Sequence, residues 1–127
     1  MNVVDSSAWL SYFSGDANST VFSEPIEEIG KLLVPSITLI EVFKCILRQC
    51  GEDSALDAIA HTEQGRVIPL DGSLAIDAAQ YGVDLKLPLA DSIIYATAQK
   101  FSAVIWTQDT DFKSLEGVKY YAKSKNT

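Results

Sequence analysis

The sequence contains no long apolar run, few cysteines and only one histidine. No stretch approaches the roughly 18–20 apolar residues that a membrane-spanning helix needs, so we expect no transmembrane segment. Residues 1–5 include neither a basic region nor a long apolar stretch, which argues against a signal peptide and predicts a cytoplasmic location. Cys45 and Cys50 lie five positions apart, a spacing that fits neither CxxC redox chemistry nor a zinc finger. We therefore expect two reduced thiols.

Internal repeats, low-complexity runs and linkers rich in proline, glycine or serine are also absent. A chain of 127 residues that is 47% hydrophobic and 21% charged is typical of one globular domain. A chain of this size can bury one core but has little room for a second. The sequence therefore predicts a single domain that covers residues 1–127.

Basic residues are too few to balance the acids, and the net charge is −7. This balance argues against nucleic-acid binding, because contacts with phosphate normally need a basic surface. The objection weakens if several acids hold a divalent cation, since the ion neutralises part of their charge and itself attracts phosphate. An acidic chain also suits a partner that carries a basic segment. The net charge alone excludes neither kind of partner.

The pattern of apolar residues predicts strands that alternate with helices. Three prolines restrict the positions of these elements: Pro25 and Pro88 fit the first turn of a helix, and Pro69 suits a strand at the edge of the sheet. The final strand is also expected at an edge. Alternation of this kind predicts an α/β fold with a mostly parallel sheet. The predicted strands are 3–4, 32–34, 67–70, 103–106 and 118–121, and the predicted helices are 8–13, 21–30, 37–49, 53–62, 73–82 and 88–101.

Two acids directly follow predicted strands, at the edge where parallel sheets bind their ligands. Asp5 follows the first strand, and Asp109 follows the strand 103–106. Structural roles are the alternative for both. Asp5 could cap the next helix, although Ser6 and Ser7 could do so instead, and Asp109 could form a turn.

Thr107 and Asp111 flank Asp109 in the same segment. Thr107 and Asp109 could both face a site at the sheet edge. Asp111 either lies beside them or caps the short helix that follows. We rank Asp109 above Asp111 for metal chemistry.

Two further acids lie in apolar helical segments. Glu41 has apolar neighbours on both sides in sequence, a costly position for a carboxylate unless it is paired or bound to a cation. The alternative for Glu41 is a solvent-facing side chain paired with Lys44. Asp91 lies in the first turn of a helix whose following residues are small or apolar. Compensation of the helix dipole is the alternative for Asp91.

Together these acids predict a metal site. Carboxylates that lie close together cannot all remain charged without a cation between them. Oxygen ligands of this kind select Mg²⁺ or Mn²⁺ over zinc or copper. A zinc site is not expected, because His61 is the single histidine and no Cys/His cluster exists. We expect His61 on a helix surface.

Four segments resemble the motifs of a known family: VVDSSAWL, PSITLIEVFK, LPLADSIIYATAQ and VIWTQDTDF. In this order, and spread over nearly the whole chain, they resemble the PIN-domain ribonucleases, in particular the VapC-type toxins of prokaryotic toxin–antitoxin pairs. The resemblance implies a Rossmann-like α/β/α sandwich around a mostly parallel sheet.

The resemblance also assigns roles to the acids. It implies that Asp5, Glu41, Asp91 and Asp109 form the catalytic quartet. Asp5, Asp91 and Asp109 would be the metal ligands, with Asp5 and Asp91 the most direct. Ser6 and Thr107 match the supporting hydroxyl residues of the family, and Asp111 could replace or assist Asp109.

The activity implied by the resemblance is Mg²⁺- or Mn²⁺-dependent hydrolysis of RNA phosphodiester bonds. The chain would act as the toxin of a type II toxin–antitoxin pair. It would form a homodimer and be silenced by a cognate antitoxin, in a groove to which the helices after Val21 and Glu52 contribute. Because water would be the nucleophile, we expect 5′-phosphate and 3′-hydroxyl ends. Candidate phosphate contacts, with solvated surface as the alternative for each, are Lys44, Arg48, Lys86, Lys100 and Lys113.

Two other classes compete with this interpretation. A phosphatase or phosphotransfer domain of Rossmann-like architecture needs Asp-x-Asp after the first strand, or paired acids there and an Asp after the third strand. The sequence offers only Asp5 at the first position, although Asp71 follows the third strand. The second alternative is a catalytically silent PIN-like binding module, against which the intact acids argue.

Overall fold

Short β-branched and apolar segments of the chain form the strands of a central sheet, and helical or turn structure follows each of them. The structure is a computed structural model that describes residues 1–123. The strands are β1 (Asn2–Val4), β2 (Leu32–Pro35), β3 (Arg66–Ile68), β4 (Val104–Thr107) and β5 (Val118–Tyr120). The helices are α1 (Ser6–Ser14), α2 (Ser19–Glu27), η1 (Ile29–Lys31), α3 (Ser36–Cys50), α4 (Glu52–Thr62), α5 (Gly72–Leu85), α6 (Leu89–Lys100) and η2 (Thr110–Phe112).

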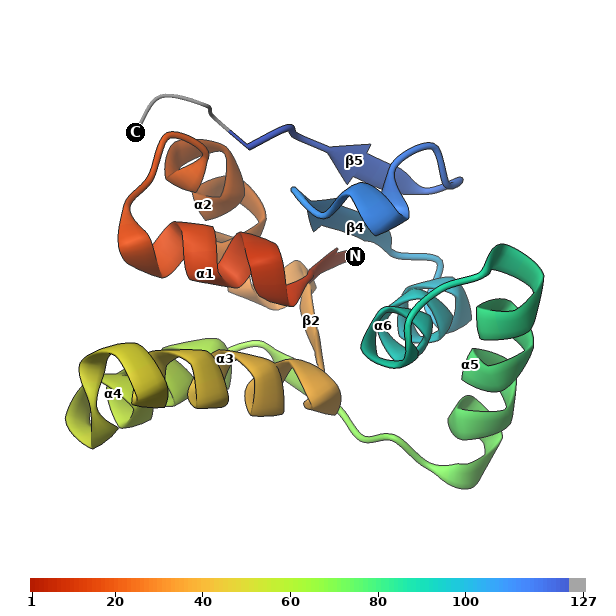
Figure 1. The fold of residues 1–127 in the computed structure, drawn as a ribbon, viewed down its shortest axis with the longest axis horizontal. Helices are drawn as coiled ribbons and strands as arrows, with labels where there is room; N and C mark the ends of the chain where they lie inside the picture. The colour runs from red at the N-terminus through yellow and green to blue at the C-terminus, as the bar shows by residue number, and fades with distance from the viewer. Residues whose placement is uncertain (124–127) are drawn as a thin grey trace.

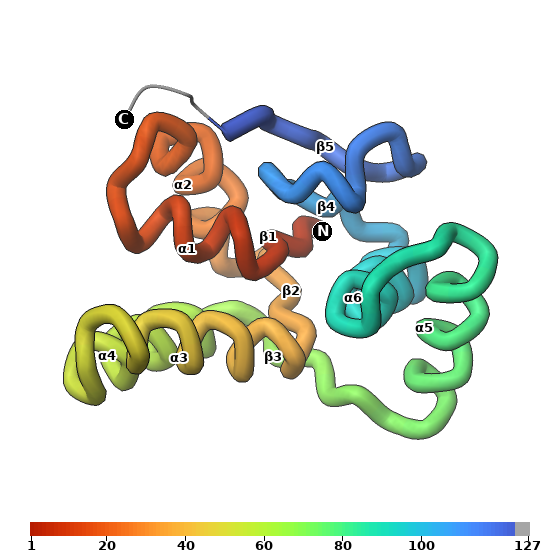
Figure 2. The backbone as a smooth tube through the Cα atoms, in the orientation of Figure 1, coloured from red at the N-terminus to blue at the C-terminus, as the bar shows by residue number. Residues whose placement is uncertain are grey.

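The five strands form one sheet in the order β3-β2-β1-β4-β5, and every pairing is parallel. Val3 at the centre is in register with Leu33 on one side and Ile105 on the other. Figure 2 shows the path of the backbone through these strands. The predicted α/β fold is confirmed, and so is the expectation that the third and last strands lie at the edges. The central position of β1 places Asp5 between β2 and β4.

Each face of the sheet carries its own apolar core, because neighbouring side chains on a strand point to opposite faces. Val3 packs with residues of α5 and α6, whereas Val4 packs with residues of α1 to α4. The result is a three-layer α/β/α sandwich, with α5 and α6 on one side and the first four helices on the other (Figure 1). Among residues 1–123, no helix is long and apolar enough to cross a membrane.

Proline positions differ from the sequence expectations at two helices. The structure places Pro25 in the last turn of α2, because the helix begins at Ser19 and ends at Glu27. The hydrogen bond that Pro25 cannot donate therefore belongs to the end of the helix, where its loss matters least. Pro88 caps α6 rather than lying in its first turn, and its carbonyl accepts from Ser92 N–H at 2.9 Å.

Helix α5 is longer than predicted and extends to Leu85. It ends at Lys86, whose φ of 56° is left-handed and breaks the helix before α6. Within α5, Tyr81 lies against Tyr95 of α6 in an edge-to-face contact, with ring centroids 5.1 Å apart.

Candidate metal centre and active site

Three carboxylates meet beyond the carboxyl end of β4. Asp91 comes from the first turn of α6, Asp109 from the residue before η2, and Asp111 from η2 itself. One carboxylate oxygen from each lies within 4.8 Å of the other two. This spacing is close enough for the three side chains to bind one divalent cation, with oxygen ligands that suit Mg²⁺ or Mn²⁺.

Asp5 lies close to this cluster but has a second role in the fold. Its exposed fraction is 2%, and its Oδ1 accepts hydrogen bonds from Ala8 N–H at 3.1 Å and from Ser7 Oγ at 2.8 Å. Asp5 is therefore the N-cap of α1, so the alternative that Asp5 caps this helix is confirmed, and neither Ser6 nor Ser7 takes its place. Both bonds end on Oδ1, so capping occupies only one of the two carboxylate oxygens.

Both buried aspartates hold protons more tightly than free aspartate. Burial raises the pKa of Asp5 from 3.8 to about 6, while hydrogen bonds from Ser7 and from Ala8 N–H oppose the rise. Burial also raises the pKa of Asp91 from 3.8 to about 8. The charge of Asp109 is the second cause for Asp91, and Asp111 and Asp5 add to it. Such mutual repulsion between acids is what a bound cation relieves.

Glu41 is held near the site by a hydrogen bond from the start of α1. It lies on α3, and its Oε1 accepts a hydrogen bond from Ser6 Oγ at 2.5 Å. The structure thus ties Glu41 to the start of α1, next to Asp5, and leaves it outside the cluster of Asp91, Asp109 and Asp111. The alternative of a Glu41–Lys44 ion pair is not seen among residues 1–123. Ser6 therefore supports Glu41 directly.

Thr107 fixes the loop that carries Asp109. Its buried Oγ1 accepts from Asp109 N–H at 2.8 Å, and Asp109 Oδ1 in turn accepts from Asp111 N–H at 2.8 Å. Asp109, not Asp111, is thus the N-cap of η2, so the alternative of Asp111 as the cap is wrong. The exposed carboxylate of Asp111 points into the cluster together with Asp109 instead of replacing it.

Two polar residues with structural roles at the site were not assigned them from the sequence. Ser7 donates to Asp5, and Gln108 holds Ser7 in place: its backbone N–H donates to Ser7 Oγ at 3.3 Å, and its Nε2 donates to Ser7 O at 3.5 Å. Gln108 Oε1 also accepts from Asn18 Nδ2 at 2.9 Å. Gln108 is buried, yet a glutamine between Thr107 and Asp109 carries no local signal of these contacts.

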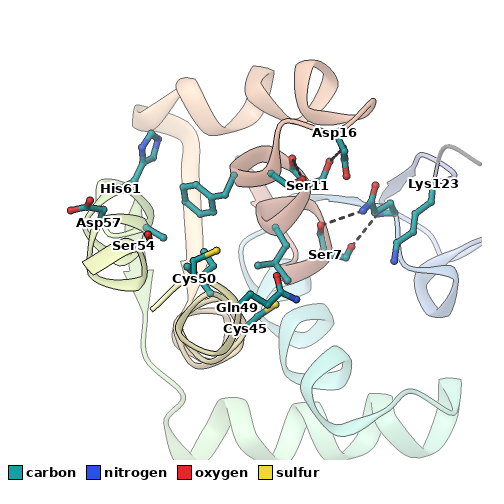
Figure 3. A pocket seen from close by; sticks show the side chains of 16 residues that line it. Ser7, Ser11, Asp16, Cys45, Gln49, Cys50, Ser54, Asp57, His61 and Lys123 are labelled. Atoms are coloured by element: carbon teal, nitrogen blue, oxygen red, sulfur yellow. Dashed lines mark hydrogen bonds between the residues drawn. The ribbon is translucent and has the colours of Figure 1, made fainter. Parts of the chain in front are cut away.

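A cavity of about 750 Å³ opens beside the site, between α1, α3 and α4 (Figure 3). Ser7 and Gln108 form part of its wall, so the cavity reaches the residues that hold Asp5. His61 on α4 lines it too, half-buried against the rings of Trp9, Tyr12 and Phe13. The expectation of a surface position for His61 is therefore only partly right.

The basic residues proposed from the sequence as phosphate contacts are all exposed. Lys113, which closes η2, is the one that follows directly on the acid cluster in the chain. Lys44 instead borders an apolar groove of about 510 Å³ on α3 and α4. Arg48 and Lys100 lie in the last turns of α3 and α6, and Lys86 ends α5.

The geometry argues against a receiver-type phosphotransfer site. Asp71, the acid after the third strand, accepts a hydrogen bond from Leu74 N–H at 2.8 Å and caps α5. The acids that converge come instead from α6 and from the loop after β4.

Solved structures share this fold over nearly the whole chain. A toxin–antitoxin complex from Klebsiella pneumoniae contains a chain that is 24% identical, with a TM-score of 0.79, over 96% of this chain and 99% of that one. VapC20 from Mycobacterium tuberculosis is described as a toxin that cleaves the sarcin–ricin loop. It is 21% identical with a TM-score of 0.76, over 93% of this chain and 97% of that one. A chain of DNA-bound VapBC from Salmonella typhimurium is 16% identical with a TM-score of 0.73, over 95% of this chain and 96% of that one.

The curated protein sequences contain no match to this chain. The PIN-domain family model, however, matches residues 3–118, which include all of the acids at the site. The fold, with its all-parallel sheet in the order β3-β2-β1-β4-β5, agrees with that match. The chain belongs to the PIN-domain family.

Proposed function

We propose that this protein is a metal-dependent endoribonuclease and acts as the toxin of a type II toxin–antitoxin pair. The observation that carries the proposal is the convergence of Asp91, Asp109 and Asp111 within 4.8 Å, with buried Asp5 close by. A fold built only for stability gains nothing from bringing acids so close together, and the charges of Asp109, Asp111 and Asp5 add to the effect of burial in raising the pKa of Asp91. The similarity to toxins of the VapC type supports the same conclusion.

The residues present fit a Mg²⁺ or Mn²⁺ ion. The donor set consists of carboxylate oxygens, and burial, together with the charges of the neighbouring acids, raises the pKa of Asp91. We propose Asp5, Asp91 and Asp109 as ligands, with Asp111 as a further ligand that the geometry adds. A bound ion of this kind supplies a bound water of lowered pKa and stabilises charge on phosphate oxygens.

The remaining side chains would position the reactants. Glu41 or Asp109 would orient the attacking water and accept its proton. Ser6 holds the Glu41 carboxylate by its hydrogen bond, and Thr107 holds the backbone of Asp109. Because the nucleophile is water, the products would carry 5′-phosphate and 3′-hydroxyl ends.

We also propose an antitoxin as a protein partner and a homodimer as the state of the toxin. The similar structure from Klebsiella pneumoniae is described as a toxin–antitoxin complex. The cavity beside the site suits a basic segment with apolar side chains, because its lining combines Asp16 and Asp57 with the apolar side chains of Leu10, Phe13 and Ile46.

The test is incubation of the purified protein with total RNA in Mg²⁺, in Mn²⁺ and in EDTA. We expect cleavage with either metal, none in EDTA, and a loss of at least about a hundredfold in rate for Asp5→Asn and for Asp91→Asn. Asp77→Asn, which changes an exposed acid of α5, is the matched control and should cleave as the wild type does.

Cleavage that persists in EDTA, or in both site variants, would contradict the metal centre. Failure to cleave any RNA with either metal would favour the catalytically silent PIN-like binding module. Sequencing of RNA ends released on induced expression identifies the substrate and checks the expected 5′-phosphate.

A further inference from the structure

Three of the ten basic residues of this acidic chain lie in one short segment at an edge of the sheet. The segment Lys113–Lys123 contains three lysines and one glutamate, in a chain with a net charge of −7. It includes β5, the edge strand next to β4, and runs from η2 along the border of the molecule toward α2 (Figure 1). We call Lys113, Lys119 and Lys123 the β5 lysines.

All three β5 lysines are exposed, and none forms an ion pair with an acid in the described part of the chain. Two of them are held over aromatic rings. Lys119 Nζ lies 4.4 Å from the centroid of the Trp106 ring, and Lys113 Nζ lies 5.6 Å from that of Tyr120. These cation–π contacts restrict the two side chains, so less conformational entropy is lost when they bind an anion.

The β5 lysines flank the end of β4 that leads into the acid cluster. Tyr120 is in register with Thr107, and Tyr121 N–H donates to Thr107 O at 2.9 Å. Lys113 follows Asp111 by two residues and closes η2. At the other end of the segment, Lys123 lines the cavity (Figure 3). Gln108, the residue that precedes Asp109 in the chain, lines the same cavity.

We propose that the β5 lysines bind the backbone phosphates of a single-stranded RNA and guide it to the acid cluster. This inference rests on the proposed function. The acid cluster repels RNA phosphates other than the one at a bound cation, so the neighbouring phosphates need positive charge close by. Within residues 1–123, the β5 edge supplies this charge in a segment that is continuous with the loop carrying Asp109 and Asp111.

The alternative is that these lysines only protect the edge strand. Lysine on an edge strand discourages pairing with strands of other molecules. Glutamate would protect the edge equally well but would repel phosphate. Charge reversal therefore separates the two roles.

The test measures binding of a fluorescein-labelled single-stranded RNA of mixed sequence by fluorescence anisotropy. Every protein carries Asp91→Asn to suppress cleavage, and the buffer contains Mg²⁺ and a series of KCl concentrations. For each of Lys113→Gln, Lys119→Gln and Lys123→Gln we expect about fivefold weaker binding at 0.1 M salt. The slope of log K against log salt should become shallower by about 0.7 for each lysine replaced.

Arg66→Gln is the matched control. Arg66 also lies on an edge strand and is exposed, and its guanidinium lies 5.2 Å from the centroid of the Phe101 ring, but it is on β3 at the opposite edge. Its replacement should leave both the affinity and the salt slope unchanged. The triple variant with glutamate at all three β5 positions should show no measurable RNA binding while retaining the circular dichroism spectrum of its parent.

Wild-type affinity in the triple glutamate variant would overturn the proposal and leave edge protection as the role. An equal loss in Arg66→Gln would overturn it too, because the effect would then be one of total charge. Binding of polyglutamate, but not RNA, with the same lysine dependence would assign the edge to an acidic protein. Metal-dependent cleavage by the unmodified protein tests the proposed function separately, so either hypothesis can fail alone.

Discussion

At the scale of single residues, the site consists of acids held in unfavourable surroundings by specific hydrogen bonds. Asp5 caps α1 and is buried, and Asp91 is only 9% exposed. The sequence predicted these acids because of their positions after a strand and in a helix's first turn. It left open whether Asp111 replaces or assists Asp109, because the place of both carboxylates in one cluster depends on how Asp109 N–H and Asp111 N–H are bonded within the loop and η2.

The raised pKa values of Asp91, about 8, and Asp5, about 6, predict how stability depends on pH. Both values exceed the 3.8 of the unfolded chain, so the folded protein binds more protons than the unfolded one between about pH 4 and pH 8. Without metal, the free energy of unfolding should therefore fall as the pH rises through this window. Thermal unfolding in EDTA across the window measures it, and added Mn²⁺ should restore stability at pH 8.

Asp91→Asn should remove the larger part of the pH dependence of the free energy of unfolding. We expect the variant to melt roughly 3–6 °C above the wild type at pH 8 in EDTA, and to gain less from Mn²⁺. The exposed Asp77→Asn should behave as the wild type under both conditions. A wild-type melting temperature that rises steadily from pH 4 to pH 8 in EDTA would show that ionisation of the buried acids does not destabilise the folded protein.

The hydrogen bond from Ser6 to Glu41 predicts a defect in rate without a defect in metal binding. Ser6→Ala frees the Glu41 carboxylate, and we expect cleavage to slow about tenfold at saturating Mn²⁺. The Mn²⁺ affinity should stay unchanged, because Glu41 lies outside the cluster of three acids. Ser6→Thr should restore most of the rate. An equal loss of metal affinity would instead make Glu41 a ligand.

At the scale of elements, the loop after β4 and the contact between α5 and α6 position the acids. The sequence identified both segments, because strand and helix periodicity is local. It could not give the strand order, which depends on pairing between residues far apart, such as Asn2 with Val104. Helix bounds were also missed: α5 extends to Leu85, and Pro25 lies in the last turn of α2 rather than in its first.

Gln108 links the loop after β4 to α1, and its replacement should weaken metal binding. Gln108→Leu removes the side-chain bonds to Ser7 O and Asn18, so Ser7, which bonds to Asp5, is held there only by the backbone N–H of residue 108. We expect Mn²⁺ affinity to fall about tenfold, as measured by calorimetry. Gln80→Leu, on the exposed face of α5, should have no effect. An unchanged affinity in Gln108→Leu would show that Asp5 does not depend on this link.

Gly82 allows α5 to approach the start of α6. A Cβ atom at Gly82 would lie 2.7 Å from Ser92 Oγ, next to Asp91. We expect Gly82→Ala to lower the free energy of unfolding by about 1–3 kcal/mol in urea titrations. Gly72→Ala at the start of α5 has open space around the new methyl group and should be nearly neutral. Equal stability of the two variants would mean that Ser92 rotates away at no cost.

At the scale of the whole molecule, apolar side chains remain exposed on the outer faces of α5 and α6. Ile76 and Val83 on α5 are 72% and 76% exposed, and Leu89 on α6 is 79% exposed. Side chains of this kind favour association with another chain. We expect light scattering to give a dimer mass for the purified protein at micromolar concentration. A monomer mass over that range would contradict the proposed homodimer.

Because residues that line the cavity also hold Asp5, we expect the cavity and the proposed metal centre to be thermodynamically linked. Ser7 and Gln108 face the cavity and also hold Asp5, so an occupant that changes their hydrogen bonds alters the affinity for the ion. Linkage is reciprocal, and ion binding must alter the affinity of that occupant by the same factor. A partner seated in the cavity could therefore be released or retained according to the cellular supply of divalent cations, without touching the acids.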